Sequence, residues 1–343
     1  MQAEKELGIQ VARAVAAICI MYFHSWIALV RFPEGAALQI PILTKFGWLA
    51  VDFFFAISGY VICLVITKPG FQPIPFLIKR CFRIYPLWIL TLTAFAAMAL
   101  AWRAPMETET IGHFLRSMTL VPTQPLPFYG PGWSLQHEVA FYLLAALVVP
   151  IAGVNGLIVV LLVSTIAAHT IEMPWYVSQL ALRHPEFLAG ILAFLMAPRL
   201  RRLGVAFPLL LGMTLLWLLM RLANENCVAP ALFFLVIAFV NIEKPPAALV
   251  AIGDASYSIY LTHMVTFFVI SAFTSKVILP SWTAEPLRFL VMAAVVVMSF
   301  ACWRLFERPL TRYGARLAAK YQQHQINLLP PTKATADRAG LDG

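Results

Sequence analysis

The chain has 343 residues, of which 61% are hydrophobic and only 12% are charged, and its formal net charge is +9. A soluble domain of this size could not bury so much apolar surface, so the composition excludes a soluble globular protein and predicts an all-α, polytopic membrane helical bundle. Membrane topology explains the positive charge better than a nucleic-acid partner, which we do not expect. The five cysteines show no CxxC pair or metal-ligand spacing, so we expect neither disulfides nor a metal site.

Apolar segments long enough to cross a bilayer recur along the chain, and about ten of them fit its length. With the N-terminus inside, the loops predicted to be cytosolic hold most of the Lys and Arg residues, and the positive-inside rule then places both termini in the cytosol. We expect a transmembrane domain at 1–306, followed at 307–343 by a cytosolic C-terminal helix and a disordered tail. The expected spans are 9–30, 43–67, 84–102, 133–152, 154–171, 176–197, 204–222, 228–242, 250–273 and 284–306.

The first span carries two ionisable residues, Arg13 and His24, eleven positions apart. Eleven residues make about three helical turns, which puts the two side chains on one face, about 16 Å apart along the axis. Because ionisable groups are costly inside a membrane, the pair predicts a functional site that faces a cavity. The structural alternative is an Arg that snorkels at a helix end and a His satisfied by a neighbouring helix.

The second span contains the sequence VDFFFAISGY at 51–60 and is expected to enter from the outer side. Asp52 should then lie at about the depth of His24. Gly59, seven residues later on the same face, leaves a gap beside the carboxylate for a ligand or a close helix. The alternative is a packing seam in which Asp52 forms a purely structural salt bridge.

The loop after this span is predicted to be cytosolic and reads KRCFRIYP at 79–86. Arg80 and Arg83 stand three positions apart and project together, which suits the binding of phosphates by two guanidinium groups. Positive-inside topology alone would also supply basic residues here.

The longest predicted outer loop, 103–132, is rich in proline and is expected to form an ordered, irregular lid. The next span opens with WSLQHE at 133–138, where Ser134 can cap the helix and Glu138 should lie at about the depth of Asp52 and His24. A carboxylate in the first turn also interacts favourably with the helix dipole, which is a purely structural explanation for it.

The ninth span carries a polar stripe. Ser256, Tyr260 and His263 follow the i, i+4, i+7 pattern and share one face of an otherwise apolar helix. Such a stripe either contacts a substrate or holds helices together.

Taken in chain order, these motifs resemble the membrane-bound acyltransferase-3 family of bacterial acyl-CoA-dependent O-acyltransferases of cell-surface polysaccharides. Each motif is short, but six of them occur in the order of the family and cover nearly the whole chain. The resemblance rests on Arg13 with His24, FFAISGY at 54–60, RCFRIYP at 80–86, WSLQHE at 133–138, SYSIYLTH at 256–263 and ERP at 307–309.

The resemblance implies the transfer of an acyl group, expected to be acetyl, from cytosolic acyl-CoA to a sugar hydroxyl at the outer face of the bacterial inner membrane. The partners would be membrane lipids and an exopolysaccharide or lipopolysaccharide acceptor, lipid-linked or polymeric, and no metal would take part. The residues implied to bind acyl-CoA as co-substrate are Arg13, Arg80, Arg83 and Tyr85. Those implied to bind substrate or to support the site are Ser58, Tyr60, Trp133, Ser134, Ser256, Tyr260 and His263.

The implied catalytic residues are His24, Glu138 and Asp52. His24 would act as general base on the acceptor hydroxyl or would form an acetyl-histidine intermediate. Glu138, which the resemblance favours, or Asp52 would orient its imidazole, as a carboxylate does in a hydrolase triad. A secondary transporter or exporter of a polysaccharide precursor or small acid would also carry ionisable residues within its helices. The sequence leaves these alternatives open, together with the oligomeric state.

Overall fold

The computed structural model describes residues 6–28, 40–101, 111–124, 126–222, 228–274 and 283–328, and all regular structure within these ranges is helical. In chain order the helices are α1 (Leu7–Ala28), α2 (Pro41–Phe46), α3 (Leu49–Ile66), α4 (Pro73–Ala101), α5 (Ile111–Thr119), α6 (Gly132–Thr170), α7 (Trp175–Ala181), α8 (His184–Leu200), α9 (Ala206–Arg221), α10 (Ala229–Val240), α11 (Ala247–Asp254), α12 (Ser256–Thr274), α13 (Ala284–Cys302) and α14 (Arg308–Leu328), with a 3-10 turn at Arg201–Leu203 and a π-helical segment at Trp303–Glu307.

Seven helical segments in the described ranges are long and apolar enough to cross a membrane, and α9 and α10 are shorter apolar helices. The chain is therefore an all-α, multi-pass membrane bundle. The count of ten spans and the cytosolic position of both termini stay predictions.

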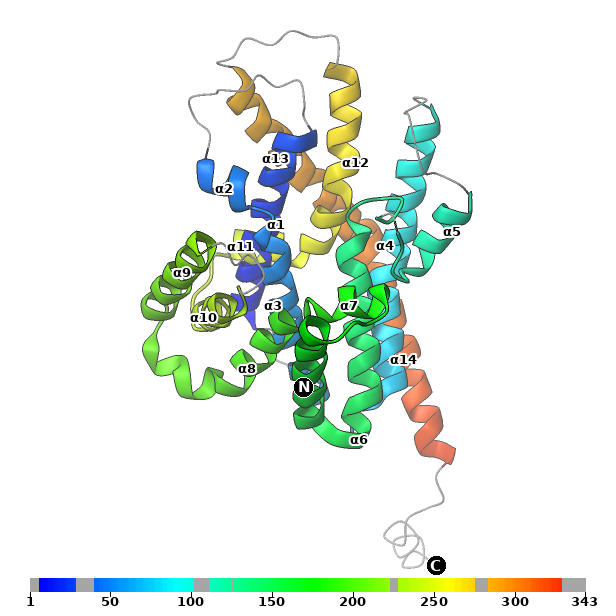
Figure 1. The fold of residues 1–343 in the computed structure, drawn as a ribbon. Coiled ribbons are helices and arrows are strands. Elements are labelled where there is room, and N and C mark those ends of the chain that lie inside the picture. The colour runs from blue at the N-terminus through cyan, green and yellow to red at the C-terminus, as the bar shows by residue number, and fades with distance from the viewer. Residues whose placement is uncertain are drawn as a thin grey trace, which may run out of the picture.

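The bundle is arranged around α1, which packs against α3, α10, α11 and α12 (Figure 1). On one flank lie α8, α9 and α10, and on the other flank α4 packs against α6 and α14. Residues from both flanks can therefore reach the neighbourhood of α1.

Small residues allow the helices beside α1 to approach closely. A Cβ atom placed on Gly59 of α3 would overlap the carbonyl oxygen of Phe187, and one placed on Gly190 of α8 would overlap that of Ala56. Such glycine contacts are typical of membrane helix pairs, because only a missing side chain lets two backbones come this near. The gap expected at Gly59 is thus filled by a close helix, α8.

The helix that carries Arg80 and Arg83 begins earlier than the sequence predicted. The expected span was 84–102, after a basic loop, but α4 begins at Pro73 and runs to Ala101. The low hydropathy of the basic residues led to the interpretation that the helix begins only after them. The helix continues there because the two guanidinium groups turn into the protein interior, as described below.

Other boundaries also differ from the expectation. The single span at 250–273 is two helices, α11 and α12, separated at Ala255. The irregular lid expected at 103–132 contains the helix α5, while residues 102–110 and 125 lie outside the described ranges. Helical structure runs from α13 through the π-helical segment into α14 without a break, and residues 329–343, the end of the expected helix and tail at 307–343, lie outside the described residues.

Gly153 divides α6 into two helical stretches. Its backbone adopts φ 63° and ψ −167°, a conformation that a glycine reaches without steric penalty. The chain reverses direction there at the lower end of the bundle (Figure 1). The expected spans 133–152 and 154–171 lie on the two sides of this glycine.

We predict that Gly190→Ala lowers the midpoint of thermal unfolding of the purified protein. The added methyl group must push α8 away from α3, and overpacking of this kind costs about 1–3 kcal/mol. Gly130→Ala is the matched control, since a Cβ there has nothing within 4 Å. Equal midpoints for the two variants would contradict the close packing of α3 and α8.

Candidate active site

An internal pocket of about 70 Å³ lies where α1, α3, α4, α6 and α12 meet. We call it the guanidinium pocket, because Arg13, Arg80 and Arg83 all line it. Eight of the residues proposed from the sequence line this pocket: Arg13, Ser58, Arg80, Arg83, Ser134, Glu138, Ser256 and Tyr260.

Arg80 and Arg83 enter the pocket from α4, and because they are three positions apart they lie on the same side of this helix. The Cζ atom of Arg80 lies 5.3 Å from the ring centroid of Phe76 and 5.2 Å from that of Tyr142. These cation–π contacts fix the position of a charge that is out of water. The two side chains therefore project together, but from a helix and not from the loop that the sequence predicted.

Glu138 is held by hydroxyl groups from two helices. Ser58 of α3 donates its Oγ–H to Glu138 Oε1 at 2.9 Å, and the hydroxyl of Tyr142 donates to the same oxygen. Tyr142 also lines the pocket, and the sequence analysis missed it. Its position one turn after Glu138, on the same helical face, is the signal that could have identified it.

The pocket contains polar atoms without partners. Arg80 Nε and Ser256 Oγ are buried and have no hydrogen-bond partner in the described part of the chain. An unsatisfied buried polar group costs about 1–3 kcal/mol, so each one in a folded protein calls for an explanation. A polar or anionic ligand in the guanidinium pocket would satisfy both atoms.

The two histidines singled out from the sequence form a pair. His24 Nδ1 lies 2.7 Å from His263 Nε2, although the residues are 239 positions apart. His263 is fully buried, and its Nδ1 lies 3.1 Å from the carbonyl oxygen of Ile259. We call His24 and His263 the histidine pair.

This chain of contacts assigns the protons. The carbonyl oxygen of Ile259 can only accept, so His263 Nδ1 carries a hydrogen and, in the neutral ring, Nε2 accepts. His24 must then donate through Nδ1, which leaves the lone pair on its Nε2. His24 is thereby held in the tautomer that a general base or nucleophile requires, as in a hydrolase triad, but by a second imidazole in place of a carboxylate.

Tyr260 lies between the guanidinium pocket and the histidine pair. It lines the pocket, and its ring centroid is 5.9 Å from that of His263 and 6.1 Å from that of Phe54. Its hydroxyl lies 2.7 Å from Ser134 Oγ and 3.2 Å from the carbonyl oxygen of Pro131. Tyr260 and Phe54 therefore line the pocket on the side where His263 lies.

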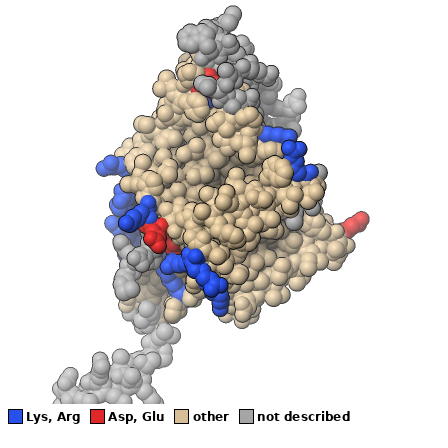
Figure 2. All heavy atoms as spheres, turned by 90° about the vertical axis from the view of Figure 1, so that its left-hand side faces the viewer, with Lys and Arg blue, Asp and Glu red and all other residues tan. Residues whose placement is uncertain are grey.

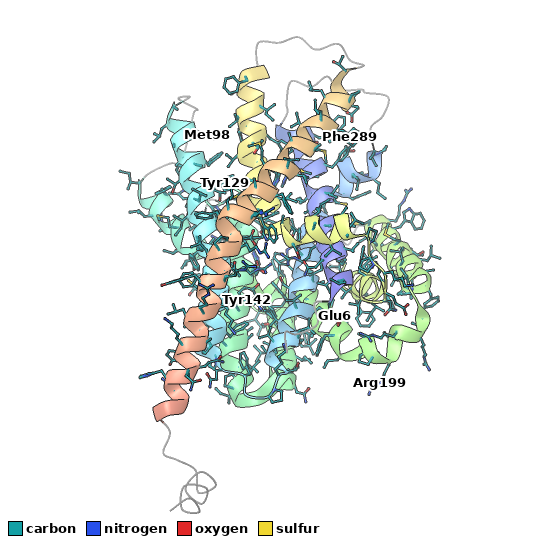
Figure 3. The ribbon with its side chains drawn as sticks, turned by 180° about the vertical axis from the view of Figure 1, so that it is seen from behind. Glu6, Met98, Tyr129, Tyr142, Arg199 and Phe289 are labelled. Carbon is teal, nitrogen blue, oxygen red and sulfur yellow. The ribbon has the colours of Figure 1, made fainter. Side chains whose placement is uncertain are left out.

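The two parts of the site lie at different heights in the bundle. Figure 3 shows Tyr142, which belongs to the pocket, below Tyr129. The hydroxyl of Tyr129 donates to the carbonyl oxygen of Leu261, two residues before His263. Arg13 and His24 are likewise separated by about 16 Å along α1. The basic groups and the imidazoles thus occupy successive levels along one axis.

Asp52 belongs to a separate ionic cluster. Its Oδ1 lies 3.0 Å from Arg183 Nη1, and Glu186 Oε1 lies 3.6 Å from the same nitrogen. Asp52 is 1% exposed and Glu186 is fully buried. The sequence analysis missed Arg183 and Glu186, although a buried Glu within a predicted span was a usable signal.

Neither carboxylate pairs with His24 as the sequence analysis expected. Asp52 pairs with Arg183, Glu138 accepts from Ser58 and Tyr142, and His24 pairs with His263. The expectation rested on the similar depth of the three residues in the membrane, but depth does not specify on which side of α1 a side chain lies.

Three further expected site residues lie outside the pocket lining, and the expected helix cap differs from the observed one. Tyr85, expected to bind the donor, donates its hydroxyl to the carbonyl oxygen of Thr119 and does not line the pocket. Tyr60 packs against Phe194, and Trp133 packs against Phe55 and His137, so neither of them lines it. Ser134 does not cap α6: the N-cap is Pro131, whose carbonyl oxygen accepts from Ser134 Oγ at 3.1 Å.

Glu307, in the ERP motif, supports the pocket from outside its lining. Its Oε2 accepts from Ser258 Oγ at 2.6 Å, which ties the junction of α13 and α14 to α12. Arg13 and Arg83 lie within electrostatic range of its carboxylate. Tyr257, which lines the pocket, donates to the carbonyl oxygen of Ile84 and joins α12 to α4.

A helical membrane bundle with an arginine-lined internal pocket and an oriented histidine pair has the parts that transfer of an activated group requires. The family model described as "Acyltransferase domain", of the acyltransferase-3 family, matches residues 6–305. The chain belongs to this family of membrane acyltransferases. It is similar to the exopolysaccharide production protein ExoZ of Rhizobium meliloti (strain 1021), with 29% identity over 293 residues that cover 78% of this chain and 90% of the relative. No solved structure matches the chain.

We predict that His263→Ala slows acyl transfer and that His263→Gln restores part of the rate. The alanine removes the acceptor for His24 Nδ1–H, whereas the amide oxygen of glutamine can accept the same hydrogen bond. The loss should be smaller than the ~10²–10⁴-fold that removal of a general base costs. The measurement is the initial rate with purified protein.

The matched control is His184→Ala, which removes a half-buried imidazole bonded to Ser164 outside the guanidinium pocket. Equal rates for His263→Ala and His263→Gln, both well folded, would mean that the pairing of the imidazoles does not matter.

Proposed function

We propose that this chain is an O-acyltransferase that moves an acyl group, expected to be acetyl, from cytosolic acyl-CoA to a sugar hydroxyl of an exopolysaccharide or lipopolysaccharide at the outer face of the bacterial inner membrane. The observation that carries the proposal is the arrangement of the guanidinium pocket and the histidine pair at successive levels of one bundle. Family membership and the similarity to an exopolysaccharide production protein support the acyl-transfer chemistry and the carbohydrate acceptor.

The donor's phosphates fit the guanidinium pocket by charge. Coenzyme A is a thiol carried on an elongated arm with a phosphate-rich head, and guanidinium groups bind phosphate oxygens bidentately. Arg80 Nε, which has no partner, is available for such a bond. The pocket of about 70 Å³ is too small for the whole molecule, so we expect it to widen when the donor binds.

The acceptor's hydroxyl meets the thioester at the histidine pair. His24 Nε2 takes the hydroxyl proton as the oxygen attacks the thioester carbonyl, the C–S bond breaks, and the leaving thiolate receives the proton from the imidazolium. In the alternative route Nε2 attacks the carbonyl first, the C–S bond breaks to release the thiolate, and the acetyl-histidine then passes its acyl group to the hydroxyl, whose proton goes to the thiolate. Both routes need the tautomer that His263 imposes on His24.

A transporter has less support. The sequence alone allowed a secondary transporter or exporter, because ionisable residues within helices are common to both classes. The family match over residues 6–305 favours the acyltransferase.

We predict that Arg80→Ala and Arg83→Ala weaken coenzyme A binding and that Arg83→Lys recovers only part of it. A lysine keeps the charge but cannot form the two-bond fork to a phosphate. Calorimetric titration of the purified protein with coenzyme A and with dephospho-coenzyme A measures the effect and identifies which phosphate is held. Arg199→Ala, an exposed basic residue at the end of α8, is the control for charge alone. Unchanged affinity in both alanine variants would remove these residues from the donor site.

We predict that donor and acceptor act from opposite sides of the membrane. Sealed right-side-out vesicles loaded with labelled acetyl-CoA should label a non-permeating acceptor supplied outside, because His24 lies about three helical turns beyond the basic residues. Vesicles with His24→Ala should transfer no label and still bind coenzyme A. If transfer occurs only when acceptor and donor share the inner compartment, the proposed sidedness is wrong.

A further inference from the structure

A second cavity lies outside the guanidinium pocket, in the cleft between α2 and α9. We call it the α2–α9 groove. Its volume is about 280 Å³, near the lower end of the range of roughly 300–1,000 Å³ for ligand pockets. The α9 side is apolar and consists of Met213, Leu216, Trp217 and Met220, which follow the i, i+3, i+4, i+7 spacing of one helical face.

Two basic residues, Lys45 and Arg221, complete the groove, and both side chains are exposed. Each lies beside an aromatic ring of the same groove, with Lys45 Nζ 5.1 Å from the centroid of Phe46 and Arg221 Cζ 5.6 Å from that of Trp217. In the described part of the chain no carboxylate forms an ion pair with either. The groove therefore combines an apolar wall with two positive charges that no carboxylate of the described residues pairs with.

The groove opens on a surface suited to lipid. Leu210 and Trp217 of α9 are 68% and 60% exposed, which a water-soluble surface would not favour. Figure 2 shows the side of the molecule on which α9 and α10 lie: uncharged residues make up most of it, and Lys and Arg gather toward its margins. An apolar face bordered by basic side chains is the pattern expected where a helix meets the hydrocarbon and the headgroups of a bilayer.

We propose that the α2–α9 groove binds an anionic phospholipid of the surrounding bilayer. Lys45 and Arg221 hold its phosphate, and the upper part of one acyl chain lies along Met213 and Trp217. A hydrocarbon chain without a headgroup would contact the apolar wall but leave the two charges unpaired. A free phosphate would pair with the charges but leave the apolar wall exposed. Only a molecule with both parts matches both features, and basic side chains at a membrane surface attract such headgroups.

The two ends of α2, which forms one side of the groove, contact α1 within two residues of His24. Ile40 N, at the start of α2, donates to the hydroxyl of Tyr22 at 3.0 Å, two residues before His24. At the other end of α2, Gly47 packs so closely on α1 that a Cβ would overlap the side chain of Phe23. A lipid in the groove thus rests on the short helix that packs against the His24 end of α1.

The test is a lipid titration of the full-length protein in neutral detergent, followed by native mass spectrometry. We expect phosphatidylglycerol to bind more tightly than phosphatidylcholine and its affinity to fall as salt is added. Lys45→Ala/Arg221→Ala should weaken phosphatidylglycerol binding by roughly 30-fold, since each basic side chain near a lipid surface is worth about 1 kcal/mol. The charge-conserving pair Lys45→Arg/Arg221→Lys should keep most of the affinity.

The matched control is Lys68→Ala/Arg199→Ala, which removes the same charge from exposed positions outside the groove. Equal losses in the two alanine pairs would mean that net charge alone attracts the lipid, and would overturn the proposal. Equal affinity of the parent for the two lipids would also overturn it, as would inorganic phosphate that binds as tightly as phosphatidylglycerol. The comparison of lipids in the parent protein needs no variant, so a failure of any variant to fold leaves the test intact.

Discussion

The bundle depends on one constraint: a charged group buried among apolar helices must be compensated by groups that the protein itself supplies. Two clusters meet this constraint in different ways. Around Arg183 two carboxylates, Asp52 and Glu186, share one guanidinium group beside the close α3–α8 contact. In the guanidinium pocket three arginines face one lining carboxylate, with Glu307 nearby, and a cavity remains. The cluster at Arg183 serves the packing of the helices, whereas the guanidinium pocket keeps an excess of positive charge for a ligand.

Hydroxyl groups do most of the work of joining the helices around this cavity. Ser58 and Tyr142 meet at Glu138, Ser134 meets Tyr260, and Tyr257 reaches the backbone of α4. Each bond is modest by itself, but together they fix the relative positions of four helices, α3, α4, α6 and α12, whose apolar faces alone would slide against one another. The geometry of the pocket therefore rests mainly on hydrogen bonds from neutral hydroxyl groups, which keep the helices that carry the charged side chains in place.

The sequence sufficed for the membrane bundle and for most of the polar residues that line the pocket. Long apolar segments and ionisable residues inside them carry that information locally, as Arg13 and Glu138 illustrate. It could not supply the partner of His24, because His263 lies 239 residues away and the rotation of α12 about its own axis decides whether the rings meet. Arg80 and Arg83 were assigned to a loop for a related reason: hydropathy cannot distinguish a charge that faces water from one that faces an internal cavity. Tyr60 and Tyr85 stand within true motifs but point to other helices.

The place of Tyr260 between the pocket and the histidine pair has a consequence for water. A thioester next to an activated imidazole is open to hydrolysis by any water molecule that reaches it, and the acyl group would then be wasted. In the proposed reaction the rings of Tyr260 and Phe54 would stand between the histidines and a donor whose phosphates have reached the arginines but whose acyl group has not yet reached the base. In the proposed reaction the donor reaches the imidazoles only when the hydrogen bonds of Tyr260 to Ser134 and Pro131 yield. Protection of the thioester would then depend on these two rings and on the hydrogen bonds that hold Tyr260 in place.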